Sequence, residues 1–130
     1  MTENPQSMLK IKDIDRSISL KNVYARLNAT PQQIAEFCQK WQIREFALFG
    51  SILRDDFRLH GDNPSDVDVL FTYGQNARRN LILQVRMQQE LEALFHRNVD
   101  LVSKTAILTS SNYIRRQNIL NSAIVIYDPG

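Results

Sequence analysis

Glycine is scarce in this sequence of 130 residues, which contains only four. They lie at positions 50, 61, 74 and 130. No combination of these positions gives the glycine-rich loops G-x-G-x-x-G or G-x-x-x-x-G-K-[ST]. A single cysteine, Cys38, excludes an internal disulfide and a zinc site built from several cysteines. The longest apolar run, 123–127, is far too short to cross a membrane as a helix. These absences exclude the common dinucleotide and P-loop cradles and a disulfide scaffold.

Charge of one sign is also not in excess. Sixteen Lys and Arg oppose fourteen Asp and Glu, for a formal net charge of +2. This balance indicates neither a membrane surface nor direct binding of nucleic acid. The first residues have no basic region followed by an apolar stretch, so we expect no secretory signal and a cytoplasmic location. The length fits one domain that can bury its own core.

Two helix starts are recognisable after a polar stretch over residues 1–16, which we expect to be a loose arm. Ser19 is a suitable N-cap, and apolar residues recur at helical spacing up to Leu27. Thr30, followed by Pro31 and Gln33, has the pattern of a capping box with proline in the first turn. The second helix carries an apolar stripe formed by Ile34, Phe37, Cys38 and Trp41.

Strands and helices alternate from position 46 onward. We predict strands over 46–49, 66–73, 98–102 and 123–127. We predict helices over 51–57, 76–96 and about 110–121, with a loop over 58–65. This interleaving predicts an α/β (α+β) domain in which helices flank a small sheet.

Acidic residues interrupt two of the predicted strands. Asp66 and Asp68 lie on one face of their strand because side chains alternate between faces. Two carboxylates so close repel each other unless a cation lies between them, and Mg²⁺ prefers such oxygen ligands. Asp100 stands in the next strand, which we expect in the same sheet. Three acids on one face would bind two Mg²⁺ ions, and Asp100 could accept the proton of an attacking hydroxyl.

A second unusual point is the pair Gly50-Ser51, where an apolar strand stops and a helix is predicted to begin. Glycine permits a tight turn and close approach of a ligand, and a helix N-terminus favours phosphate. Taken alone, each pattern also has an ordinary interpretation. Gly50-Ser51 could be a plain turn, and Asp66 and Asp68 could be solvated acids at the end of a strand. The two patterns and Asp100 together favour phosphoryl chemistry.

These residues resemble the DNA polymerase beta-like nucleotidyltransferase superfamily. The stretch 48–58, Leu-Phe-Gly-Ser-Ile-Leu-Arg-Asp-Asp-Phe-Arg, is especially similar to the minimal nucleotidyltransferases (MNT antitoxins). The resemblance covers about residues 31–127. It implies a polymerase beta-like nucleotidyltransferase fold, with a catalytic domain over 31–130 and an arm and helix over 1–30.

The resemblance also implies roles for six residues. Gly50 and Ser51 would hold the phosphates of ATP. Arg54 would touch these phosphates, or else form a surface ion pair with Asp55 or Glu45. The metal ligands would be Asp66, Asp68 and Asp100, with Asp100 also acting as the base. The segment between Ser51 and Asp66 is longer than is usual in the family, which predicts that 59–64 bulge outward.

The family resemblance finally implies a partner. Minimal nucleotidyltransferases are paired with a HEPN-domain ribonuclease toxin (HepT), which they inactivate by transferring AMP from ATP to a tyrosine. We therefore expect a Mg²⁺-dependent protein adenylyltransferase that acts as an antitoxin. One alternative is an antitoxin that only binds and masks the toxin, and another is a transferase for a small-molecule hydroxyl. The basic pairs 78–79 and 115–116 are solvated, or they contact ATP or an acidic partner surface.

Overall fold

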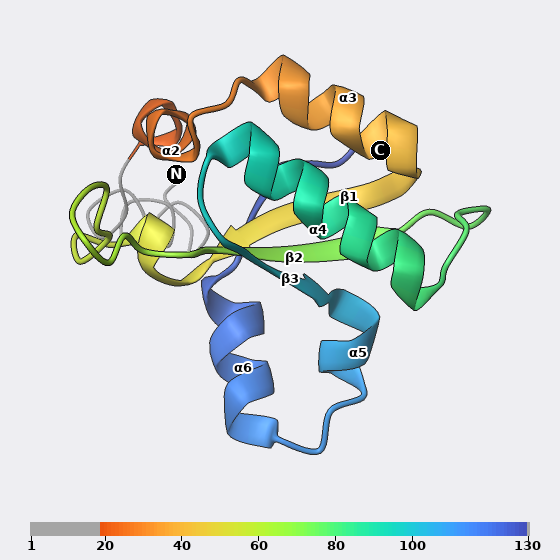
Figure 1. Cartoon of the computed structure of the whole chain (residues 1–130). Coiled ribbons are helices and arrows are strands. Elements are labelled where there is room, and N and C mark those ends of the chain that lie inside the picture. Colours follow the sequence, from red (N-terminus) through yellow and green to blue (C-terminus); the bar gives the residue numbers. More distant parts are fainter. Residues whose placement is uncertain (1–18, 130) are drawn as a thin grey trace, which may run out of the picture.

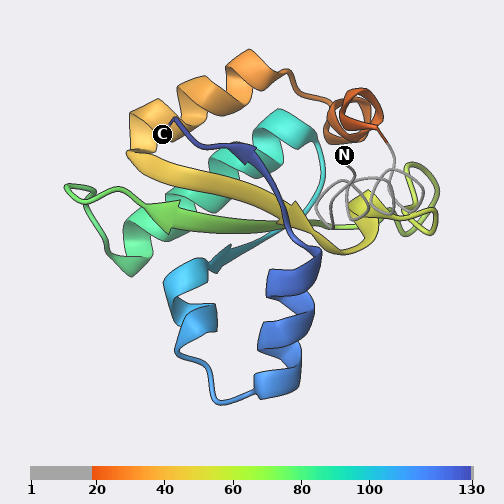
Figure 2. The ribbon, with the colours of Figure 1, turned by 180° about the vertical axis from the view of Figure 1, so that it is seen from behind.

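A four-stranded mixed sheet lies at the centre of the computed structural model, which describes residues 19–129 (Figures 1 and 2). The strands are β1 (Ile43–Phe49), β2 (Val67–Tyr73), β3 (Val99–Ser103) and β4 (Ile124–Tyr127). Their order is β3-β2-β1-β4, with β1 antiparallel to both of its neighbours and β2 parallel to β3. The mixed α/β fold predicted from the sequence is confirmed, whereas the expected arm over 1–16 lies outside the described residues.

Helices cover both faces of this sheet (Figure 1). One face carries α2 (Leu20–Leu27), α3 (Pro31–Trp41) and α4 (Leu81–Phe95). The other carries α5 (Lys104–Leu108) and α6 (Tyr113–Ser122). The larger core lies under α2–α4, and a smaller one lies under α5 and α6. No helix among residues 19–129 has the length and apolar character to cross a membrane.

The first two helices begin where the capping signals predict. The Ser19 hydroxyl accepts a hydrogen bond from the Asn22 N–H at 3.3 Å. The Thr30 hydroxyl accepts from the Gln33 N–H at 3.1 Å, and the Gln33 side chain accepts from the Thr30 N–H at 2.9 Å. This reciprocal pair satisfies two backbone N–H groups that have no partner within the helix. The buried Val23 and Leu27 place α2 in the same core as α3 and α4.

Three predicted helices differ from the observed ones. The segment 51–57 forms only the short 3-10 turn η1 (Gly50–Leu53), because Arg54 is extended and the chain turns to bury Phe57. The helix predicted over 76–96 begins at Leu81, where the Asn80 side chain caps it. The last helix begins at Tyr113 rather than after Ser110 or Ser111, since Asn112 is its N-cap. Helix α5 was not predicted, since its five residues are too few to show a period.

Helix α4 provides the crossover that a parallel pair of strands requires. Its buried residues are Met87, Leu91 and Phe95, which pack on the larger core. The Gln88 side chain donates to the Val99 carbonyl at 2.9 Å, and the Glu92 carboxylate accepts from the Val99 N–H at 3.0 Å. These contacts fix the first residue of β3 against α4. They thereby fix the position of Asp100, the next residue.

Candidate active site

Asp68 lies at the point where three strands meet at one end of the sheet. In the register of the sheet it is opposite Phe49, the last residue of β1, and opposite Asp100 on β3. Neighbouring strands are about 4.8 Å apart, so the backbones of Asp68 and Asp100 are direct neighbours. The sequence placed these two acids in one sheet, and the parallel pairing puts them side by side.

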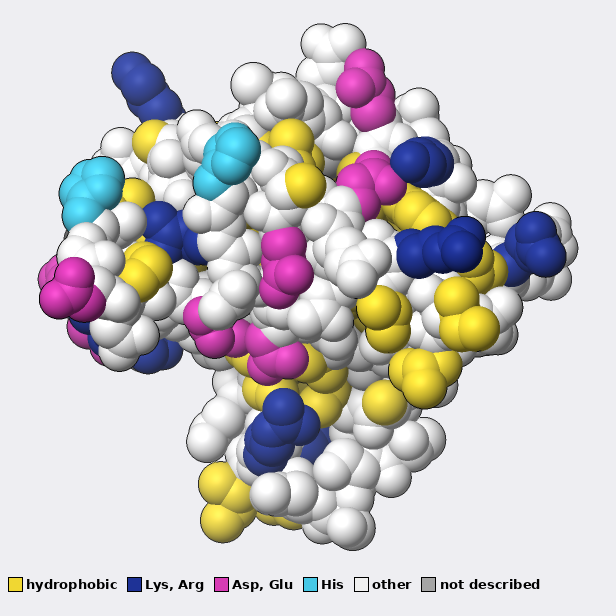
Figure 3. Space-filling model, viewed as in Figure 1, with side chains coloured by type: hydrophobic (Ala, Val, Ile, Leu, Met, Phe, Trp, Pro, Cys, Tyr) yellow, Lys and Arg dark blue, Asp and Glu magenta, His cyan; other side chains and the backbone are white. Residues whose placement is uncertain are grey.

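Both acids face α5 and α6 rather than the larger core. Val67 and Val69, on either side of Asp68, are buried in that core, and so are Val99 and Leu101 beside Asp100. Since side chains alternate along a strand, the acids between them face the opposite side. Asp100 is exposed, whereas Asp68 is half-buried. Figure 3 shows acidic side chains gathered directly above basic side chains that lie over α6.

The backbone conformation and the surroundings of position 50 both favour glycine. Its φ of +80° is in the left-handed region that side chains rarely adopt. A Cβ atom at this position would also collide with the Oδ2 atom of Asp68. The turn at the end of β1 therefore comes into close contact with the Asp68 carboxylate, with no side chain between them.

Negative charge is concentrated around Asp68. The pKa of Asp68 is raised to about 6, first by burial and then by the charges of Asp100 and Asp66. The charges of Arg54 and Arg115 act in the opposite direction. Arg115 is on α6, so one member of the basic pair 115–116 lies within electrostatic reach of Asp68, whereas Arg116 donates to the Ser110 carbonyl at 2.9 Å. This crowding of carboxylates favours a bound cation.

An open pocket of about 350 Å³ is lined by some of the predicted site residues. Four of them contribute to it: Ser51, Arg54, Asp66 and Asp68. The other lining residues are Asp56, Arg58, Asn63, Pro64 and Ser65. Asp100 and Gly50 are not among the lining residues, although Asp68 is next to both. The loop over 58–65 thus forms one wall, a role that the sequence pattern did not indicate.

Arg54 forms a surface ion pair, but not with either expected partner. Its Nε atom is 3.1 Å from the Asp56 carboxylate, and both side chains are exposed. Glu45 instead pairs with Lys104 at 2.9 Å. Because Asp56 also lines the pocket, this pair would have to open for the Arg54 guanidinium to contact a phosphate there.

Residues 59–64 are all exposed, as expected for a loop that bulges outward. The ends of this loop are nevertheless closed by two hydrogen bonds. The Arg58 N–H donates to the Ser65 hydroxyl at 2.8 Å, and the Ser65 N–H donates to the Arg58 carbonyl at 2.9 Å. Ser65, directly before Asp66, is the one buried polar residue among those described.

The donor set fits Mg²⁺ shared with phosphate oxygens. Within residues 19–129, no three His, Cys, Asp or Glu side chains form a preformed metal cage. Mg²⁺ in phosphate-handling sites keeps several waters and takes one or two carboxylates plus substrate phosphates. Asp68 with Asp66 or Asp100 supplies that number of oxygen donors beside an open pocket. These acids therefore suit a metal that arrives with its nucleotide.

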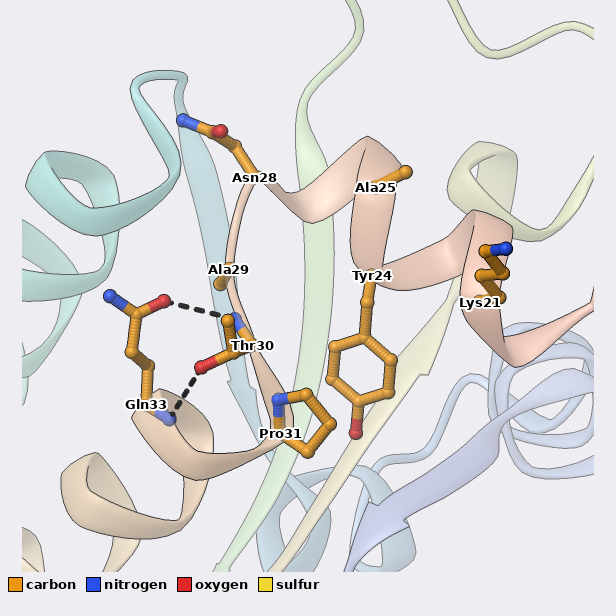
Figure 4. Close-up of a pocket in the computed structure, with 8 residues that line it drawn as sticks. All are labelled: Lys21, Tyr24, Ala25, Asn28, Ala29, Thr30, Pro31 and Gln33. Carbon is orange, nitrogen blue, oxygen red and sulfur yellow. Dashed lines mark hydrogen bonds between the residues drawn. The ribbon is translucent and has the colours of Figure 1, made fainter.

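A second pocket, of about 440 Å³, lies where α2 leads into α3 (Figure 4). It contains no predicted site residue and no acid. The Thr30–Gln33 capping box forms part of its wall, with both hydrogen bonds satisfied internally (Figure 4). The acidic site and the larger hollow are therefore separate.

Comparison with known proteins identifies a family match and several similar solved structures. A family model described as the nucleotidyltransferase domain matches residues 31–126. A solved structure assigned as a minimal nucleotidyltransferase is 25% identical, with a TM-score of 0.53 over 82% of this chain and 95% of that one. No curated protein sequence matches significantly.

Two further structures share the fold at lower identity. One is the tri-AMPylated Shewanella oneidensis HEPN toxin in complex with its MNT antitoxin, matched at 19% identity and a TM-score of 0.52 over 78% of this chain and 71% of that one. The other is a toxin–antitoxin structure with AMP-PNP, matched at 17% identity and a TM-score of 0.53 over 76% and 73%. All three are consistent with the polymerase beta-like fold expected from the sequence.

Proposed function

The chain belongs to the nucleotidyltransferase domain family, and on this basis we propose that it is an antitoxin that transfers AMP from ATP to a tyrosine hydroxyl of a HEPN-type ribonuclease toxin. The observation that carries this proposal is the placement of Asp68 between the Gly50 turn and Asp100. Acids on adjacent strands beside a glycine turn would supply oxygen donors for a cation next to a phosphate.

Each residue has a proposed task. Asp66 and Asp68 would bind Mg²⁺, with Asp100 next to them, and Mg²⁺ would offset the negative charge of the reacting phosphates. The Gly50–Ser51 backbone would contact these phosphates, with Arg54 close by. Asp100 is exposed and would take the proton of the attacking hydroxyl. The new bond joins the tyrosine oxygen to the α-phosphorus, and the bond from that phosphorus to the pyrophosphate oxygen breaks.

The proposed partner and nucleotide come from the molecules with which similar structures were solved. A relative of this fold was solved with a tri-AMPylated HEPN toxin, and another with AMP-PNP. Both share the overall fold with this chain. The proposal extends their partner and nucleotide to this protein, together with the tyrosine acceptor that the sequence resemblance implies.

The test is to mix the protein with its cognate HEPN protein, ATP and Mg²⁺, and to weigh the HEPN protein by mass spectrometry. We expect a mass gain in multiples of one AMP. The double variant Asp66→Asn/Asp68→Asn should give no gain, while Glu36→Gln, an exposed acid on α3, should behave as the wild type. Protection of cells by the double variant without labelling would instead establish masking of the toxin, and labelling by the double variant would overturn the assigned site.

A further inference from the structure

The segment joining β1 to β2, residues 50–66, forms most of the pocket but has little structure of its own. Only η1 has regular secondary structure. Residues 54–56 and 58–64 are exposed, and Phe57 between them is buried. An irregular segment of this length loses much conformational entropy when it is held in one shape. Contacts from elsewhere in the chain must therefore stabilise it.

Arg97, which follows α4, supplies one set of these contacts. Its guanidinium donates to the backbone carbonyls of Ser65 at 2.7 Å, Leu59 at 3.0 Å and Arg58 at 3.2 Å. Its Cζ atom also lies 4.8 Å from the centre of the Phe57 ring. One side chain thus holds both ends of the 58–65 loop.

Arg26, on α2, supplies the second set. Its Nη1 atom donates to the carbonyls of Ile52, at 3.1 Å, and of Arg54. Its Cζ atom lies 5.3 Å from the centre of the same Phe57 ring. Helix α2 lies outside residues 31–126, the part that matches the nucleotidyltransferase family. A helix beyond that match therefore holds the turn that carries Ser51.

The Arg97 guanidinium is partly buried, which has a cost in desolvation. Its Nε atom is buried and has no hydrogen-bond partner among the described residues. Burial lowers the pKa of the Arg97 guanidinium, and the charge of Asp66 acts in the opposite direction. Partial desolvation of a guanidinium is unfavourable unless charge-assisted hydrogen bonds offset it. The three carbonyls provide that offset, and Asp66 lies within electrostatic reach.

We propose that Arg26 and Arg97 are positioning residues that hold segment 50–66 in the shape that binds the triphosphate of ATP with Mg²⁺. Arg26 fixes the half that contains Ser51, and Arg97 fixes the half that contains Asp66. Neither lines the pocket, so both act through the backbone they hold. This inference rests on the proposed function, because it takes a nucleoside triphosphate as the ligand of the pocket.

The test compares Arg26→Gln and Arg97→Gln with Arg79→Gln in the full chain. Arg79 is a matched control, since it also donates to a backbone carbonyl, that of Gly74 at 3.0 Å, and lies over an aromatic ring, Tyr73 at 5.4 Å. It lies beyond the other end of β2. Calorimetric titration with ATP and Mg²⁺ measures affinity without an acceptor, and hydrogen exchange reports on the segment.

We expect both test variants to bind ATP with Mg²⁺ about tenfold more weakly or worse, and Arg79→Gln to bind as the wild type does. Exchange should accelerate at the Arg58 and Ser65 amides in Arg97→Gln, and at the Arg54 amide in Arg26→Gln. Should Arg97→Gln not fold, Arg97→Lys keeps the charge, loses the forked donors and should show the same pattern in milder form.

Three results would overturn the inference in distinguishable ways. Faster exchange with unchanged ATP affinity would mean that the arginines stabilise the loop but do not position it for the ligand. Weaker binding with unchanged exchange would mean that they contact the nucleotide themselves. A wild-type protein that binds no ATP would refute the proposed function, and the triphosphate role of the arginines with it.

Discussion

Asp68 is half-buried beside two other acids, at the edge of a pocket, on a strand whose neighbouring residues are fully buried. An aspartate is a poor choice for a strand and a costly one to desolvate. Asn at this position would keep the shape without the charge. The acid at this position is therefore in keeping with the proposed cation site.

Replacing Asp68 by Asn should stabilise the metal-free protein at neutral pH. The pKa of Asp68 is about 6 in the folded state and about 3.9 in an unfolded chain, so the folded state favours the protonated form. The charged form therefore lowers stability above pH 6, and this loss disappears as the pH falls to about 4. With allowance for solvent screening at a half-exposed group, we expect a gain of about 1 kcal/mol at pH 7.5.

Urea unfolding at pH 7.5 and at pH 4, without metal, measures this difference. Glu36→Gln serves as a control that should change little at either pH. A less stable Asp68→Asn protein at pH 7.5 would show that the carboxylate has stabilising partners of its own.

Gly50→Ala tests the close approach of the β1 turn to Asp68. The alanine must adopt a φ of +80° and must also displace the Asp68 carboxylate. Gly61→Ala is the matched control, because its φ of +101° imposes similar strain while nothing lies within 4 Å of the added Cβ. We expect both to lose about 1 kcal/mol from backbone strain, and only Gly50→Ala to lose binding of ATP with Mg²⁺ as well. Equal ATP affinity in the two variants would contradict this account.

At the scale of elements, the unit β2-α4-β3 brings Asp68 and Asp100 together. The two strands are parallel and in register, which requires a crossover between them. Helix α4 buries its face of Met87, Leu91 and Phe95 on the sheet and leaves its first two residues, Leu81 and Ile82, exposed. The packing of this one helix therefore decides where Asp100 lies relative to Asp68.

Leu91→Ala should destabilise the protein by about 3 kcal/mol, since Leu91 is fully buried and its loss leaves a cavity. Leu81→Ala, in the same helix but 75% exposed, should change the free energy of unfolding by less than about 0.5 kcal/mol. Thermal or urea unfolding of the two variants gives the comparison. Similar losses in both would mean that the first turn of α4 is also packed in solution.

At the scale of the whole molecule, one larger core spans the sheet and helices α2, α3 and α4. Cys38 lies inside it with no exposed surface, and burial raises the pKa of its thiol to about 12. The α2 helix belongs to this core although it precedes the matched family region. Folding of the described chain should therefore be cooperative.

The Cys38 thiol should report that cooperativity. At pH 8 the native protein should react with a thiol reagent only as fast as it opens, because the thiol is both protonated and inaccessible. The rate should rise steeply with urea and reach that of the free thiol in the unfolded protein. Rapid stoichiometric reaction in native buffer would show that α3 separates from the core on its own.

Local chemistry made much of the fold predictable. The caps at Ser19 and Thr30 depend on residues within three positions of each other, and both are confirmed. Alternation along β2 placed Asp68 away from Val67 and Val69, whereas Asp66, expected on the same strand face, lies just before the strand begins. The start of α4 was placed too early although Asn80 is its N-cap, because a loop held by hydrogen bonds to Gly74 replaces the expected first turns.

The sequence by itself determined the acids, the glycine turn, the alternation of strands and helices and, through them, the family. The tertiary structure alone decided that Asp68 and Asp100 are neighbours, and that Arg26 and Arg97 hold the pocket wall. The physical reason is the distance along the sequence between the residues that interact. Caps and strand faces follow from a few adjacent residues, whereas strand order and contacts with distant carbonyls depend on how the whole core packs.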